Sequence, residues 1–139
     1  GAGLIDVVAN VYLSRAELML ELGDTSMAAT CCAMALDIYR ETGDKLGEAD
    51  SYRLLGNVFT RRKQWTTAEA LFEDSIRLNV EFDNPLNVAE TQRDLGCLYA
   101  SRGQKMKAEE ALMKAREGFE KLGAQTDVDA VNALIAELG

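Results

Sequence analysis

The sequence predicts an all-α fold: a right-handed superhelical solenoid of three helical hairpins and a C-terminal capping helix, seven helices in total. Three observations support this. Small residues recur at an offset of 40 along the 139-residue chain, and periods of this size are typical of stacked helical hairpins. Apolar residues follow a helical period, and the chain contains only one Pro. The recurring residues are Ala9, Ala49 and Ala89, then Ala16, Gly56 and Gly96, then Ala28, Ala68 and Ala108.

The first repeat, residues 5–44, is predicted to form one antiparallel hairpin. Apolar residues follow helical spacing up to Gly23-Asp24, a pair that ends the first helix. The second helix begins near Thr25 and ends at Gly43, a suitable residue to follow a helix C-terminus. Asp44 is then placed to cap the next helix, because its carboxylate can accept a hydrogen bond from a free amide. The apolar residues that show the first helix are Val7, Val8, Val11, Tyr12, Leu18, Met19 and Leu22.

The second and third repeats, residues 45–84 and 85–124, repeat this plan. The second ends at Asp83-Asn84-Pro85, where Pro suits a first helical position because it has no amide hydrogen to leave unpaired. The third ends at Gly123. We expect the capping helix over residues 126–138, with Thr126 and Asp129 as a variant capping box. Its apolar residues form one stripe: Val128, Val131, Leu134, Ile135 and Leu138.

Composition argues against several classes of function. The net charge is −8, whereas nucleic-acid binding needs a basic surface, so no nucleic-acid partner is expected. The chain contains no His, the commonest general base and metal ligand, and no catalytic, metal or cofactor motif is recognisable. No apolar run is long enough to span a bilayer, so no membrane association is expected. Residues 1–139 are therefore predicted to be a single non-enzymatic domain, a fragment of a larger cytoplasmic protein.

The three cysteines show no metal-binding spacing. We expect Cys31, Cys32 and Cys97 to be reduced and buried, as is usual in cytosolic proteins.

The pattern within each repeat resembles the tetratricopeptide repeat (TPR). In the middle repeat the matching residues are Tyr52, Leu55-Gly56, Phe59, Ala68, Phe72 and Ser75. Small residues in this pattern let the two helices approach, and large ones fill the neighbouring space. The period of 40 exceeds the usual 34. It is similar to the repeats of Leu-Gly-Asn repeat polarity adaptors, kinesin light chains and ATPase-linked bacterial TPR regulators.

The resemblance implies that the first helix of each hairpin lines a concave groove. Carrying the family's surface positions onto this chain assigns groove contacts to all three repeats. They are Asn10, Leu13 and Glu17; Asp50, Arg53, Asn57 and Arg61; and Glu90, Arg93, Cys97 and Ser101. Arg53 and Arg93 are equivalent at the offset of 40, and two guanidinium groups can hold a carboxylate or an acidic peptide. Asn57 can both donate to and accept from a peptide backbone.

An alternative is that these arginines pair within their own helices, Arg53 with Asp50 and Arg93 with Glu90. The basic run Arg61-Arg62-Lys63 is interpreted as a solvated helix end, with a polyanion site as its alternative.

The leading functional hypothesis is a protein-interaction scaffold that binds a peptide or a helix in the groove, from a partner protein or from its own parent chain. Two alternatives stay open. One is a small-molecule-sensing module of a multidomain signalling or transcriptional regulator. The other is a self-assembly module, in which copies of the chain form a homo-oligomer.

Overall fold

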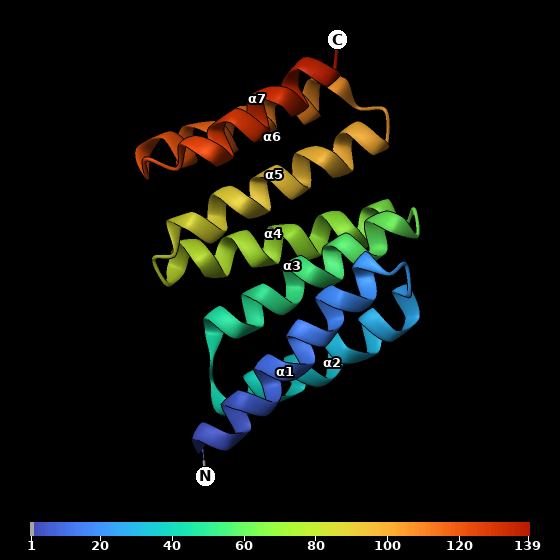
Figure 1. The fold of residues 1–139 in the computed structure, drawn as a ribbon, viewed down its shortest axis with the longest axis vertical. Coiled ribbons are helices and arrows are strands. Elements are labelled where there is room, and N and C mark those ends of the chain that lie inside the picture. The colour runs from blue at the N-terminus through green and yellow to red at the C-terminus, as the bar shows by residue number, and fades with distance from the viewer. Residues whose placement is uncertain (1) are drawn as a thin grey trace. The chain divides into compact units, whose positions relative to one another are not determined.

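The computed structural model describes the backbone of residues 2–139 and the side chains of residues 3–139, and over that range it contains seven helices and no strand (Figure 1). The all-α prediction is confirmed, and the capping helix lies within one residue of its predicted bounds. The helices are α1 (Ala2–Glu21), α2 (Thr25–Thr42), α3 (Lys45–Arg61), α4 (Trp65–Glu81), α5 (Pro85–Ser101), α6 (Lys105–Lys121) and α7 (Gln125–Glu137).

The chain divides into two compact units, the first ending at Leu78 and the second running Asn79–Gly139. In the first unit α1 packs along α2, and α2 also packs on α3 (Figure 1). In the second unit α5 packs along α6, and α6 also packs on α7. Helices α2 and α6 therefore each contact the helix before them and the helix after them.

One turn geometry recurs every 20 residues. At each of the six turns between the described helices, one residue has a positive φ, and the amide of the next residue donates to the carbonyl five residues back. The Asp44 amide, for example, lies 2.9 Å from the Tyr39 carbonyl oxygen. This is the 6→1 hydrogen bond of a Schellman motif. The residues with positive φ are Gly23 (84°), Gly43 (76°), Lys63 (59°), Asp83 (53°), Gly103 (80°) and Gly123 (70°).

The residue after each turn begins the next helix, and in three cases its side chain caps it. The side-chain oxygens of Asp24, Asp44 and Asn84 accept the amide three residues on, at 3.0, 2.9 and 3.4 Å. The predicted cap at Asp44 and the helix start at Asn84-Pro85 are therefore confirmed.

The predicted capping box of α7 is wrong. Because α7 begins at Gln125, its N-cap is Ala124, which has no side chain that can accept a hydrogen bond. Asp129 instead accepts from the side-chain amide of Gln125 at 2.8 Å.

The core depends on close approach between the two helices of a hairpin. A Cβ atom placed on Gly56 of α3 would lie 2.6 Å from the Phe72 ring of α4. At the equivalent position, a Cβ on Gly96 of α5 would lie 2.7 Å from Leu112 of α6. Neither position has room for a side chain, since real Cβ contacts essentially never fall below 3.0 Å. These glycines therefore set the distance between the paired helices.

Two turns carry a residue other than glycine at the left-handed position. This predicts that substitution by glycine increases stability. Left-handed backbone costs an ordinary L-residue roughly 1–2 kcal/mol, and Asp tolerates it better than Lys. We expect Lys63→Gly to raise the free energy of unfolding by about 1 kcal/mol, and Asp83→Gly to raise it less. Urea unfolding followed by circular dichroism measures both. Equal stability of Lys63→Gly and wild type would contradict this reading of the turn.

Two buried groups predict a loss of stability at high pH. Burial, with a smaller contribution from Cys31, raises the pKa of the Cys32 thiol from 9.0 to about 12. Burial, followed by the Asp44 carboxylate, raises the pKa of Tyr39 from 10.0 to about 12. Between these values the unfolded chain releases protons that the folded chain retains, so folding becomes less favourable as pH rises.

We therefore expect the free energy of unfolding to fall between pH 9 and 12, when measured by urea titration at a series of pH values. In Cys32→Ala the fall should be smaller, because the contribution of Cys32, which extends from its unfolded pKa of 9.0 to about 12, is removed. A pH dependence identical to that of wild type would show that Cys32 ionises equally well in both states.

Candidate functional site

The first candidate surface lies on α3. Asp50, Arg53 and Asn57 are spaced three and four residues apart, which places them on one face of the helix. All three side chains are half-buried, and none of them is free of interactions. The opposite side of α3 is in the core, where Gly56 faces Phe72 and Val58 is fully buried. Packing of α3 therefore fixes the direction of this polar face.

The second candidate surface lies on α5, where Glu90, Arg93 and Cys97 have the same spacing and are also half-buried. Arg93 is the best defined of them. Its Nε lies 3.6 Å from the Asp94 carboxylate, and its Nη1 lies 3.8 Å from the carboxylate of Asp127 on α7. Its guanidinium carbon lies 5.9 Å from the centre of the Phe119 ring, a cation–π contact.

These contacts balance the positive charge of Arg93 but leave its N–H groups able to donate hydrogen bonds. Both ion-pair distances exceed the 2.7–3.2 Å typical of an N–H···O hydrogen bond. The contact with Phe119 joins the guanidinium carbon to an aromatic ring, which has no hydrogen-bond acceptor oxygen, and the guanidinium has five N–H donors. Arg93 can therefore still donate hydrogen bonds, in competition with two neighbouring carboxylates.

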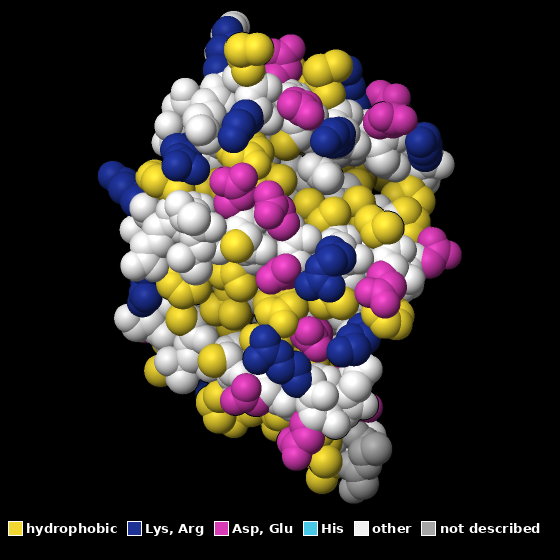
Figure 2. Space-filling model, turned by 180° about the vertical axis from the view of Figure 1, so that it is seen from behind, with side chains coloured by type: hydrophobic (Ala, Val, Ile, Leu, Met, Phe, Trp, Pro, Cys, Tyr) yellow, Lys and Arg dark blue, Asp and Glu magenta, His cyan; other side chains and the backbone are white. Residues whose placement is uncertain are grey.

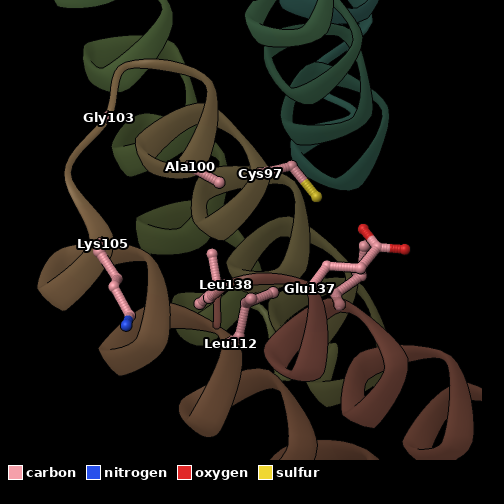
Figure 3. A pocket seen from close by; sticks show the side chains of 8 residues that line it. Cys97, Ala100, Gly103, Lys105, Leu112, Glu137 and Leu138 are labelled. Atoms are coloured by element: carbon pink, nitrogen blue, oxygen red, sulfur yellow. The ribbon is translucent and has the colours of Figure 1, made fainter.

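Cys97 lines an open pocket of about 320 Å³ formed by α5, α6 and α7. Figure 3 shows the Cys97 thiol and the Glu137 carboxylate on one side of the pocket and the Lys105 ammonium on the other. The Lys105 ammonium donates to the backbone carbonyl of Gly139. Burial raises the pKa of the Cys97 thiol, so at neutral pH it is a neutral thiol. The volume is at the lower end for small-molecule sites, and the hypothesis of a small-molecule sensor stays a prediction.

The predicted α1 contacts differ among themselves. Asn10 accepts a hydrogen bond of 2.5 Å from the Tyr39 hydroxyl of α2, which gives it a structural role in the first hairpin. Leu13 is half-buried against the core cluster that contains Tyr39. Glu17 is exposed. Asn10 is also exposed, but of these three residues only Asn10 forms a side-chain hydrogen bond within the described range, so Glu17 is the exposed one without such a structural role.

The basic run at the end of α3 is not simply a solvated helix end. Arg61 donates to the Leu20 carbonyl at the end of α1. Arg62 donates to the side chains of Thr25 and Ser26 at 3.2 and 3.0 Å. These bonds tie α3 to the turn between α1 and α2, and Arg61 satisfies a carbonyl of the kind that helix ends leave unpaired. Sequence reasoning missed them, because the partners lie 36 to 41 residues away.

Charges of both signs are interspersed on the face shown in Figure 2, without a large patch of one sign in that view. Over the described residues, no three His, Cys, Asp or Glu side chains group in a way that could hold a metal ion. Nor does any helix in that range have both the length and the apolar content required to cross a bilayer. Cys31 and Cys32 are buried as predicted, whereas Cys97 is only partly buried.

Helices joined by turns of one recurring geometry, with small residues where paired helices approach closely, are typical of a helical repeat protein. A family model described as "Tetratricopeptide repeat" matches residues 7–81, more than half of the chain. The chain therefore belongs to the tetratricopeptide repeat family, as its sequence pattern predicts.

Among solved structures, the chain is similar to BtubC (BKLC) from P. vanneervenii, with a TM-score of 0.65 at 17% sequence identity. The match covers 96% of this chain and 64% of that one. At this identity the likeness shows a shared fold. No curated protein matches the sequence.

Proposed function

We propose that this chain is a scaffold that binds an extended peptide or a helix of a partner protein through the first helices of its hairpins. Tetratricopeptide repeats generally mediate protein–protein interaction, and their folds are typically non-enzymatic. The observation that carries the proposal is Arg93, whose guanidinium contacts Phe119 and lies beyond typical hydrogen-bond distance from both neighbouring carboxylates.

The ligand group that best fits Arg93 is a carboxylate. A guanidinium can bind a carboxylate through two parallel hydrogen bonds of about 2.7–2.9 Å, shorter than either of its present ion pairs. Asp127 holds Arg93 from α7 at 3.8 Å, so an incoming carboxylate would compete with it. Asp127 therefore limits affinity for acidic ligands, and Arg93 provides it.

On α3, Arg53 and Asn57 supply the corresponding polar contacts in the proposal. The Asn57 amide can donate to and accept from a peptide backbone, which suits a ligand of variable sequence. Asp50 and Glu90 flank the two arginines, so a ligand of mixed charge is favoured over a uniformly acidic one.

The test starts from peptides selected against the wild-type chain from a random peptide library. We expect Arg93→Ala to weaken binding of the acidic peptides about tenfold or more, because charge-assisted hydrogen bonds contribute about 1.5–3 kcal/mol. Asp127→Asn should strengthen it, because Arg93 loses a competing carboxylate. The double variant Arg53→Ala/Arg93→Ala should bind more weakly than either single variant. Fluorescence anisotropy at low salt measures each affinity.

The matched control is Arg77→Ala. Arg77 lies on α4, is more exposed than Arg93, and pairs with Asp74 of its own helix at 3.3 Å. Its removal should leave the affinity unchanged. Equal binding of the selected peptides to wild type and to a folded Arg53→Ala/Arg93→Ala variant would remove this proposal.

A further inference from the structure

A second open pocket, of about 320 Å³, lies where the turn between α4 and α5 meets the end of α6. We call it the Asn79 pocket. All of its lining residues belong to the second compact unit, and none of them lines the pocket of Cys97. Val80, Pro85, Val88 and Ala89 supply apolar lining beside Asn79. A mostly apolar pocket of this size, with few polar groups, is typical of small-molecule sites.

The repeat explains why there is space at this place. At the offset of 40, Asn79 corresponds to Tyr39 in the first repeat and to Phe119 in the third. Both rings are buried, with 1% and 0% exposed. Phe119 packs in a cluster with Val128, and the equivalent of Val128 in the second repeat is Val88, which lines the pocket. The chain thus has a smaller polar side chain where its neighbouring repeats have an aromatic ring.

A second lining position also lacks a large side chain. Gly118 of α6 corresponds to Ile38 and Leu78 at the offset of 40. Ile38 packs against the cluster that contains Tyr39, and Leu78 is buried. The pocket therefore forms where two large apolar side chains of the repeat pattern are both replaced by smaller residues.

The side-chain oxygen of Asn79 gives the pocket a hydrogen-bond acceptor. Asn79 is 1% exposed. It does interact with other residues, but its side-chain oxygen accepts no hydrogen bond within the described range. A buried acceptor without a donor is costly, because water no longer solvates it. A ligand that donates a hydrogen bond to this oxygen removes that cost.

The charged residues of the pocket favour a neutral ligand. Lys114 and Lys121 line it, and each already has a carboxylate partner on its own helix. The Lys114 ammonium lies 3.6 Å from Glu110, and the Lys121 ammonium lies 3.2 Å from Glu117. Asp83 adds a negative charge to the lining, and the whole chain carries −8, so an anion gains little here.

We propose that the Asn79 pocket binds a free, neutral aromatic small molecule of the indole or phenol type. The ring takes the place that Tyr39 and Phe119 have in the other repeats, and its N–H or O–H donates to the side-chain oxygen of Asn79. This site is separate from the proposed peptide surface, because it contains neither Arg53 nor Arg93.

The probes are two isomers of equal size, 3-methylindole and 1-methylindole. Only the first has an N–H, because the methyl group of the second replaces that hydrogen. Each is titrated into the full chain labelled with ¹⁵N, and the dissociation constant is measured from amide chemical shifts. We expect 3-methylindole to bind about fivefold more tightly or better, because one neutral hydrogen bond contributes a factor of this size. The shifts should centre on the amides of Val88, Ala89 and Gly118.

Two substitutions of Asn79 separate its two contributions. Asn79→Leu keeps a side chain of similar size without the acceptor, so the two isomers should bind it with equal affinity. Asn79→Phe restores the ring of the other repeats, so neither isomer should bind. Met106→Phe is the matched control, because it adds the same ring at a residue of α6 that is 85% exposed and outside the pocket. It should leave both affinities unchanged, and circular dichroism checks that each variant is folded.

Equal binding of the two isomers to the wild-type chain would overturn the proposal, and so would shifts that centre on Cys97 or Arg93. Undiminished binding to a folded Asn79→Phe variant would overturn it too. If that variant does not fold, the isomer pair and the position of the shifts decide. A third probe, N-acetyltryptophanamide, carries the same ring within a peptide-like group. Tighter binding of this probe than of 3-methylindole would assign the pocket to a side chain of a partner protein and contradict a free ligand.

Discussion

The structure depends on how closely the two helices of each hairpin approach, and this distance is set by one pair of residues 16 positions apart. In the three hairpins the pairs are Ala16 with Cys32, Gly56 with Phe72, and Gly96 with Leu112. The first member becomes smaller where the second becomes larger. A ring or a branched side chain can lie over the first helix only if that helix has no Cβ there. The pair therefore orients each first helix, and with it the polar face that α3 or α5 presents.

The sequence predicts the repeat fold well, because the small residues that close helix packing requires recur at the same positions in every repeat. It predicts the turns less completely. Glycines at 23, 43, 103 and 123 are separated by multiples of 20, and this was the available signal for a turn at 63 and at 83. Lys63 hides the first of these turns, since Lys seldom adopts a positive φ, whereas Asn84-Pro85 reveals the second as a helix start. At these positions tertiary packing and the Schellman hydrogen bond override the local preference.

The candidate sites show the limit of a one-dimensional pattern more clearly. The 40-residue offset places Arg53 and Arg93 at equivalent positions of two repeats. It cannot show that Arg93 pairs with Asp127, which lies 34 residues further along the chain. Helical spacing likewise identifies α1 without showing which of its two apolar faces meets α2. The structure places the small residues Ala9 and Ala16 in the core and leaves the larger Val11 and Leu18 exposed. Hydrophobicity alone would have ranked these faces in the opposite order.

The most direct test of the central claim is a double-mutant cycle on Gly56 and Phe72, with the free energy of unfolding measured by urea titration. Helix propensity alone would make Gly56→Ala stabilising by up to about 1 kcal/mol. If contact with the Phe72 ring sets the helix distance, Gly56→Ala instead destabilises the chain by about 1–3 kcal/mol. In a Phe72→Cys background, where the pair becomes that of Ala16 with Cys32, the cost should fall by about 1 kcal/mol or more, since residues 56 and 72 are in contact. A stabilising Gly56→Ala with the same effect in both backgrounds would contradict the account.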